Sequence, residues 1–203
     1  LFSDVRGGGI ALAHNGNLTN ARVLREELVN HGQIFQSTSD SEVVLHLAAL
    51  SKKNKLTNRV LSALKQVQGA FAFVAVVNDR LIVARDPYGI RPLVMGRLDD
   101  AYIFASETCA LDMVGATFVR EIEPGEALVV NEQGVRSERF APARTAQPCA
   151  FEYIYFARPD SVIEGRSVYE ARKEMGRQLA LETPADVDVI IPVPDSGVPA
   201  AIG

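Results

Sequence analysis

Apolar residues recur every three or four positions in three early segments of the chain, and this period predicts three helices. The first covers residues 19–30, with Thr19 or Asn20 as its N-cap. The second begins at a capping box formed by Ser39 and Glu42. The third covers residues 57–68. Before the first helix, the apolar run 9–13 predicts a strand that ends in a tight polar turn.

The pattern then changes to short apolar runs joined by polar links, which predicts consecutive hairpins. Helices followed by hairpins indicate an antiparallel sheet packed with helices. The three expected hairpins pair residues 70–77 with 81–85, 93–96 with 102–106, and 126–130 with 135–140.

The last part of the chain has a third pattern. Residues 141–148 are polar and irregular, which predicts a linker. Beyond it we expect a short aromatic strand at 151–156, a helix opened by the Ser167–Glu170 capping box, and a buried strand at 187–193. Strand, helix and strand in this order are typical of the start of a parallel sheet, with ligands bound at the strand's carboxyl end.

Composition narrows the class of protein. The 203 residues are 47% hydrophobic and 23% charged, with a net charge of −4, which is ordinary for a globular protein and gives no support for nucleic-acid binding. No apolar run approaches the roughly 18 residues of a membrane span. Two cysteines, Cys109 and Cys149, favour a reducing cytosol over a disulfide framework. We therefore expect a cytoplasmic protein without nucleic-acid or membrane partners.

Asn15, Gly16 and Asp40 are the candidates for chemistry. An Asn amide and a Gly backbone N–H aimed at one point suit a developing oxyanion. Asp40 stands at the mouth of the second expected helix and can pair with a charged amine. Each has a plainer explanation, since Asn-Gly is a common turn and an acid at a helix N-terminus is favoured by the macrodipole.

Six longer segments carry a family resemblance. The chain resembles the class II glutamine amidotransferases, and among them the branch with a phosphoribosyltransferase domain. The resemblance covers essentially the whole chain. The segments that carry it are residues 14–20, 39–42, 85–93, 105–112, 151–161 and 192–197.

The resemblance implies an α+β fold. Residues 1–147 would form a glutaminase domain, a four-layer αββα N-terminal-nucleophile sandwich that is incomplete at its N-terminus. Residues 148–203 would begin an α/β type I phosphoribosyltransferase domain. It also implies the activity: ammonia released from glutamine is transferred to 5-phosphoribosyl 1-pyrophosphate, giving 5-phosphoribosylamine for purine synthesis. The enzyme would be a homo-oligomer, a dimer or a tetramer.

The resemblance assigns roles to individual residues. Asn15 and Gly16 match the oxyanion hole, and Asp40 matches the carboxylate that holds the glutamine α-ammonium. Ser196 matches a position associated with Mg²⁺ and the pyrophosphate substrate. Cys149 matches one ligand of a [4Fe–4S] cluster that some members hold and others lack, so both possibilities stay open.

Other residues and other relatives must also be weighed. The family's nucleophile is an N-terminal cysteine, which would precede Leu1; we expect this chain alone to be inactive. Cys109 is expected to be a buried structural thiol and His14 a hydrogen-bonded neighbour of the turn. Asp86 and Arg91 are expected to brace the bend between them by an ion pair.

The alternatives are an asparagine synthetase, a hexosamine-forming transaminase, or a non-enzymatic regulatory domain on the same fold. The segment 151–161 argues against the first two, and the presence of Asn15, Gly16 and Asp40 argues against the third.

Overall fold

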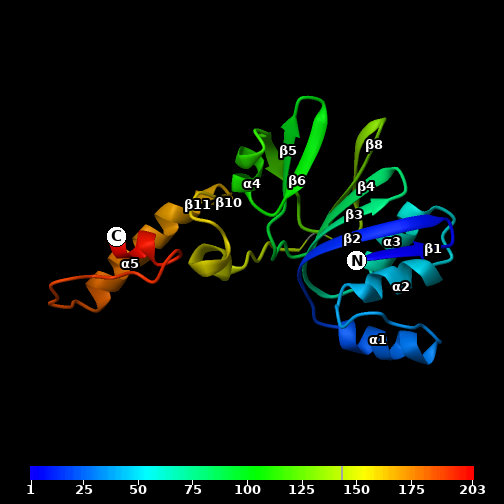
Figure 1. The fold of residues 1–203 in the computed structure, drawn as a ribbon, viewed down its shortest axis with the longest axis horizontal. Coiled ribbons are helices and arrows are strands. Elements are labelled where there is room, and N and C mark those ends of the chain that lie inside the picture. Colours follow the sequence, from blue (N-terminus) through cyan, green and yellow to red (C-terminus); the bar gives the residue numbers. More distant parts are fainter. Residues whose placement is uncertain (143) are drawn as a thin grey trace. The chain divides into compact units, whose positions relative to one another are not determined.

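The computed structural model describes residues 1–142 and 144–203 (Figure 1). The described chain divides into two compact units. The first unit holds Leu1–Leu93 and Ile122–Pro148, and the second holds Val94–Glu121 and Cys149–Gly203. The expected domain boundary between residues 147 and 148 stays a prediction, although the second unit also contains the hairpin 94–105.

The first unit is built on a six-stranded antiparallel sheet with the order β1-β2-β3-β4-β8-β9. β2 and β3 form its longest ladder, from Ile10 opposite Val77 to Leu18 opposite Gly69. β1 pairs with β2 only as far as Ala11, so the second half of β2 extends beyond β1. The strands are β1 (Phe2–Val5), β2 (Gly8–Leu18), β3 (Gly69–Val77), β4 (Arg80–Arg85), β8 (Glu126–Asn131) and β9 (Gly134–Arg139).

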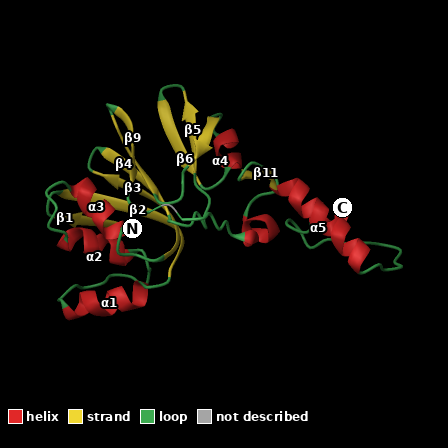
Figure 2. Cartoon of the chain, turned by 180° about the vertical axis from the view of Figure 1, so that it is seen from behind, coloured by secondary structure: helices red, strands yellow, loops and turns green. Residues whose placement is uncertain are grey.

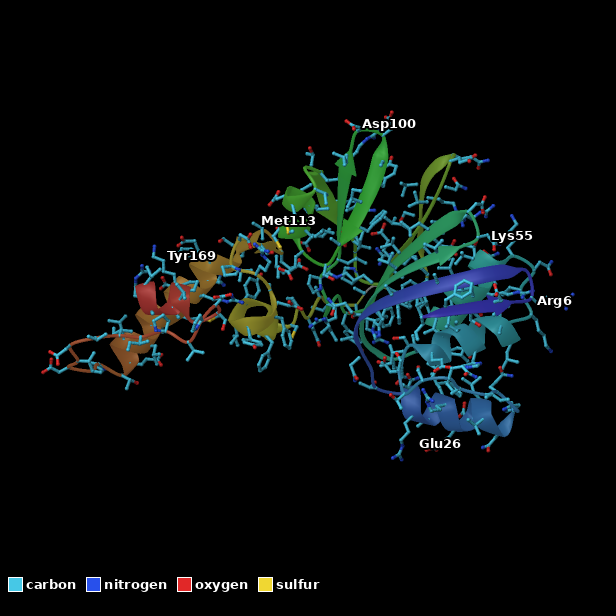
Figure 3. The ribbon with its side chains drawn as sticks, viewed as in Figure 1. Arg6, Glu26, Lys55, Asp100, Met113 and Tyr169 are labelled. Carbon is cyan, nitrogen blue, oxygen red and sulfur yellow. The ribbon has the colours of Figure 1, made fainter. Side chains whose placement is uncertain are left out.

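Three helices accompany this sheet: α1 (Ala21–Asn30), α2 (Glu42–Leu50) and α3 (Leu56–Leu64). Figure 1 shows α1 beside α2, and the labelled Glu26 on the outer side of α1 in Figure 3. The helices and sheet share one apolar core, in which Val43 of α2 and Phe71 of β3 are fully buried. Burying a side chain of this size stabilises the fold by about 1.5–3 kcal/mol, so these residues hold α2 against β3.

The second unit contains a three-stranded sheet with the order β6-β5-β7 (strands in Figure 2). Leu111 of α4 is fully buried against it. Towards the C-terminus a π-helical turn η1 is followed by a two-stranded ribbon and two helices. The bounds are β5 (Val94–Leu98), β6 (Ala101–Ala105), α4 (Thr108–Met113), β7 (Thr117–Glu121), η1 (Glu152–Phe156), β10 (Val162–Ile163), β11 (Arg166–Ser167), α5 (Val168–Glu182) and α6 (Val198–Ile202).

The three predicted hairpins are confirmed as β3–β4, β5–β6 and β8–β9. The expected polar turn after residue 13 is wrong, because β2 continues to Leu18 and pairs with β3 along its whole second half. Strand pairing overrides the local preference of Asn15-Gly16 for a turn. β1 and β7 were not predicted.

Two strands predicted near the C-terminus are also corrected. Residues 151–156 contain the π-helical turn η1 rather than a strand, and residues 187–193 form no strand. Ile191 is 84% exposed and Val193 is 80% exposed, so this apolar run is not buried either. An extended segment becomes a strand only when another strand accepts its hydrogen bonds. No strand among residues 1–142 and 144–203 pairs with this segment.

Two of the three predicted caps differ from the structure. Ser167 caps α5 as predicted, its hydroxyl accepting a hydrogen bond from Glu170 N at 3.3 Å. Asn20 instead uses its side chain to bind the backbone of Gln66 and Gln68. The box expected between Ser39 and Glu42 does not form, because the Glu42 carboxylate accepts hydrogen bonds from the backbone N–H groups of residues 36 and 37 and from the Ser37 hydroxyl.

Candidate active site

The exposed end of β2 positions Gly16. In an antiparallel ladder the N–H groups of one strand point alternately to its two sides. Phe71, which lies opposite Gly16, exchanges hydrogen bonds with Asp86 on its far side, so it does not bind Gly16. Leu12 lies four residues before Gly16 on β2, so the N–H groups of both point to the same side of the strand. The N–H of Leu12 donates to Leu1 O at 2.7 Å, on the side of β2 away from β3. The Gly16 N–H therefore faces the stretch of this edge that no described strand covers.

Asp40 lies at this same edge. Its Oδ2 accepts the N–H of Leu18 at 2.8 Å, and Leu18 has the same parity as Gly16. Two residues along a strand span about 7 Å. A backbone donor and a carboxylate thus stand side by side at one sheet edge. The sequence alone suggested this pair, but it placed Gly16 in a turn and Asp40 at the mouth of a helix.

His14 and Ser41 surround the Asp40 carboxylate. Ser41 Oγ donates to Asp40 Oδ1 at 3.1 Å and lies 2.8 Å from His14 Nδ1. The His14 ring stacks on Phe73, with ring centroids 4.3 Å apart. Burial lowers the pKa of His14 below 6.5 despite the nearby Asp40 carboxylate. His14 is therefore a neutral hydrogen-bonded neighbour at pH 7, which agrees with its expected role.

The amide of Asn15 has a partner that the sequence does not predict. Arg91 Nη2 donates to Asn15 Oδ1 at 2.5 Å, across 76 residues of chain. Because successive strand residues point to opposite faces, the Asn15 side chain projects from the face opposite to His14. With its oxygen directed at Arg91, the Asn15 Nδ2 group is turned away from the guanidinium.

The bend that carries Arg91 is held by two buried charged residues. Asp86 is fully buried and accepts hydrogen bonds from the backbone N–H groups of Phe71, Tyr88, Ile90 and Arg91. The Arg85 guanidinium, also buried, donates to the carbonyl oxygens of residues 89, 91 and 122 at 2.8–2.9 Å. The sequence predicted an ion pair between the side chains of Asp86 and Arg91. In the structure the Asp86 carboxylate instead binds backbone N–H groups, and it is the Arg85 guanidinium that binds carbonyl groups.

Gly16 also has a steric reason to be glycine. Its φ is +144°, and a Cβ built there would lie 2.1 Å from the carbonyl oxygen of Ala70. A side chain cannot be accepted without shifting the backbone of β3. The close approach of the two strands thus depends on this residue.

The remaining predicted site residues lie in the second unit. Ser196 lies in the turn before α6 and lines a cavity of about 650 Å³ with Arg158, Asp160 and Asp195. Cys149 is a partly exposed free thiol next to η1. Cys109 is buried in α4, and burial raises its pKa, which supports the structural role expected for it.

Neither a metal cage nor a membrane span is found in the part of the chain that the structure describes. No three His, Cys, Asp or Glu side chains there gather closely enough to hold a metal ion. None of the described helices has the length and apolar character needed to cross a bilayer.

Comparison with known proteins gives a consistent picture. Residues 2–113 match the family described as a glutamine amidotransferase domain. The chain is 51% identical over 208 aligned residues to amidophosphoribosyltransferase of Rhizobium etli, covering 100% of this chain and 42% of that protein. It is 49% identical to amidophosphoribosyltransferase of Bacillus subtilis, covering 100% of this chain and 43% of that protein.

A solved structure of glutamine phosphoribosylpyrophosphate amidotransferase from B. subtilis, complexed with ADP and GMP, superposes with a TM-score of 0.94 and 48% identity. The match covers 100% of this chain and 45% of that chain. This chain thus spans about two fifths of the length of the relatives it matches. It belongs to the glutamine amidotransferase domain family, and over its whole length it is similar to amidophosphoribosyltransferases.

Proposed function

We propose that the first unit binds glutamine and supports release of ammonia from its side-chain amide. The whole protein would use this ammonia to convert 5-phosphoribosyl 1-pyrophosphate to 5-phosphoribosylamine. The observation that carries the glutaminase part is the outward Gly16 N–H at the same sheet edge as the Asp40 carboxylate. The phosphoribosyl part is supported by amidophosphoribosyltransferases about 50% identical over the whole chain.

The roles follow from the chemistry of an amide substrate. When a nucleophile attacks the amide carbon, the amide oxygen becomes negative and needs fixed donors. The Gly16 N–H and the Asn15 Nδ2 group would supply them. Glutamine also carries an α-ammonium, separated from the amide carbon by three methylene or methine carbons. Asp40 would hold that ammonium by a charge-assisted hydrogen bond, about two strand residues from the oxyanion donor.

The nucleophile is expected to be the family's N-terminal cysteine, acting with its own α-amine as base. Both cysteines of this chain lie in the second unit, whereas β2 belongs to the first. The low pKa of His14 leaves its imidazole neutral at pH 7, and one ring nitrogen is occupied by Ser41. His14 therefore orients the Ser41 and Asp40 groups.

The second unit is proposed to begin the phosphoribosyltransferase domain, with Ser196 near a Mg²⁺–pyrophosphate assembly. Ser196 and Asp195 supply oxygen donors next to one cavity. Mg²⁺ is usually held by one or two protein oxygens together with substrate phosphates, so these residues fit such an ion as a partial donor set. In the loaded enzyme the ion would neutralise pyrophosphate charge. The whole protein is further proposed to be a cytoplasmic homo-oligomer.

The donors present do not fit an iron–sulfur cluster by themselves. A [4Fe–4S] cluster needs four thiolates, and among the described residues Cys149 does not belong to any group of side chains that could hold a metal. The chain's other cysteine is buried in α4. No step of the reaction is assigned to a cluster.

The glutaminase proposal is tested in the complete enzyme by comparing glutamine with free ammonia as nitrogen donor. Asn15→Ala is expected to lower the glutamine-dependent kcat by about 100- to 1000-fold, since an oxyanion donor is lost, while ammonia-dependent synthesis persists. Asp40→Asn is expected to raise the KM for glutamine. Asp79→Asn, an exposed change at the β3–β4 turn with a side chain 78% exposed, is the matched control. Equal loss with both nitrogen donors would contradict the proposal.

A further inference from the structure

We propose that Arg91 is a positioning residue for the oxyanion hole, orienting the Asn15 amide so that its NH₂ group faces the substrate. The inference rests on the proposed glutaminase function and extends it to a residue on a different element. Its basis is the 2.5 Å hydrogen bond from Arg91 Nη2 to Asn15 Oδ1, formed across 76 residues of chain.

An unrestrained Asn side chain can rotate its amide and present either its oxygen or its nitrogen to a neighbour. Only the nitrogen is useful to an oxyanion, because the amide oxygen would repel it. A guanidinium has hydrogen-bond donors and no acceptor, so it can bind the Asn15 amide only when Oδ1 faces it. Its permanent charge also makes this hydrogen bond stronger than one between neutral groups.

An orienting group must itself be held still, and the structure shows how Arg91 is held. The backbone N–H of Arg91 donates to the Asp86 carboxylate at 3.3 Å, and its carbonyl oxygen accepts a hydrogen bond from Arg85 Nε at 2.8 Å. Asp86 and Arg85 are 0% and 2% exposed. Both polar groups of the Arg91 backbone are thus bound to buried charges.

This bend is also tied to the strands of the site. Asp86 Oδ2 binds the N–H of Phe71, which lies opposite Gly16 in the β2–β3 ladder. The same carboxylate therefore fixes the strand behind Gly16 and the loop that carries Arg91. The two proposed oxyanion donors, the Gly16 N–H and the Asn15 amide, share one buried anchor.

The test uses the complete enzyme and three variants, Arg91→Met, Arg91→Lys and Asn15→Ala. Arg91→Met removes the donor and keeps a chain of similar length. It is expected to lower the glutamine-dependent kcat by about 10- to 100-fold, less than the loss of the donor itself. The KM for glutamine and the ammonia-dependent rate should change less than about twofold, because Asp40 and the second unit are untouched. Arg91→Lys keeps a cation with one suitable donor and should recover most of the kcat.

A double variant distinguishes positioning from other roles. If Arg91 acts only through Asn15, then Asn15→Ala combined with Arg91→Met should be no slower than Asn15→Ala alone. Multiplied losses in the double variant would show that Arg91 acts independently of Asn15 and would overturn the inference. Arg22→Met, which removes an arginine with a side chain 89% exposed on α1, is the control and should match the wild type.

The outcomes separate this inference from the proposed function. If Asn15→Ala leaves glutamine-dependent turnover intact, the proposed function fails. If Asn15→Ala abolishes turnover while Arg91→Met leaves kcat unchanged, only the positioning role fails. Should Arg91→Met lose the ammonia-dependent rate as well, the Arg91→Lys variant decides: a wild-type KM with most of the kcat recovered supports positioning, and parallel loss of both activities refutes it.

Discussion

Replacing Asp86 with asparagine should loosen the bend that joins the sheet to Arg91. The Asp86 carboxylate accepts backbone N–H groups with both oxygens and is completely buried. Oδ1 lies 2.9 Å from Tyr88 N, while Oδ2 lies 3.0 Å from Ile90 N and 3.2 Å from Phe71 N. An asparagine has one acceptor oxygen in place of two, and its NH₂ group must face N–H donors.

The cost follows from the least harmful orientation of that amide. With its NH₂ at the Oδ1 position, asparagine keeps the partners of Oδ2 and leaves the Tyr88 N–H without an acceptor. A buried orphaned donor costs about 1–3 kcal/mol. The remaining hydrogen bonds lose their charge assistance, about 1 kcal/mol each, and relief of the buried charge offsets part of that loss. The net local destabilisation is about 2–4 kcal/mol.

Hydrogen exchange in the complete protein measures this loss where it occurs. A decrease of about 2–4 kcal/mol in opening free energy speeds exchange of the Tyr88 and Ile90 amides by roughly 30- to 700-fold, if they exchange by local opening. The exposed variant Asp79→Asn, changed in the same chemical way, should leave these amides unaffected. An acceleration of less than about twofold in Asp86→Asn would refute the reasoning, because it would mean that the four N–H contacts contribute nothing to the bend.

Three further substitutions test other contacts. Burial alone would raise the pKa of Glu42, but hydrogen bonds from residues 36 and 37 outweigh it and lower that pKa below 4.5. The stability that Glu42 contributes is thus present above pH 4.5 and lost as the pH falls through the lowered pKa. The free energies of unfolding of Glu42→Gln and wild type, measured by denaturation, should therefore become equal as the pH is lowered. Burial lowers the pKa of His14, so its contribution to the free energy of unfolding is complete above pH 6.5 and declines as the pH falls through the lowered pKa. His14→Gln should flatten the dependence of urea unfolding on pH below about 6.5. Gly16→Ala should destabilise the protein by more than about 2 kcal/mol, because its Cβ would meet Ala70 O at 2.1 Å; Gly7→Ala, with positive φ and open space, should cost less in the same thermal melt.

Local patterns predicted the elements whose partners lie nearby in the sequence. The hairpin 70–85 is an example, since two apolar runs separated by a polar link pair with each other. The cap at Ser167 is another, because Ser167 and its partner Glu170 lie within four residues of each other. The strand predicted at 187–193 failed for the opposite reason: its apolar composition suits a sheet, but its hydrogen bonds need another strand, and none of the described strands supplies it.

The site shows the same division between local and distant information. Asn15, Gly16 and Asp40 were proposed as site residues from the sequence, but the Asn15-Gly16 pair lies in a strand and not in the expected turn. The Asn-Gly pair adopts the strand because β3 pairs with it, and this pairing turns the Gly16 N–H to the open edge. A turn would have placed the Asn15 amide and the Gly16 N–H through contacts near in sequence, whereas the observed strand places them through its pairing with β3.

Arg91 could not be assigned to Asn15 by any local rule, since 76 residues separate them. One signal was nevertheless present. Arg85 ends β4 and Asp86 follows it directly, next to buried apolar residues where charges are costly unless they are hydrogen-bonded. Their burial is compensated by the backbone of the bend that they hold, and that bend presents Arg91 to β2. Charged residues at the end of a buried strand thus point to a loop whose conformation is fixed, and the side chain at the far end of such a loop is the place to look for a positioning role.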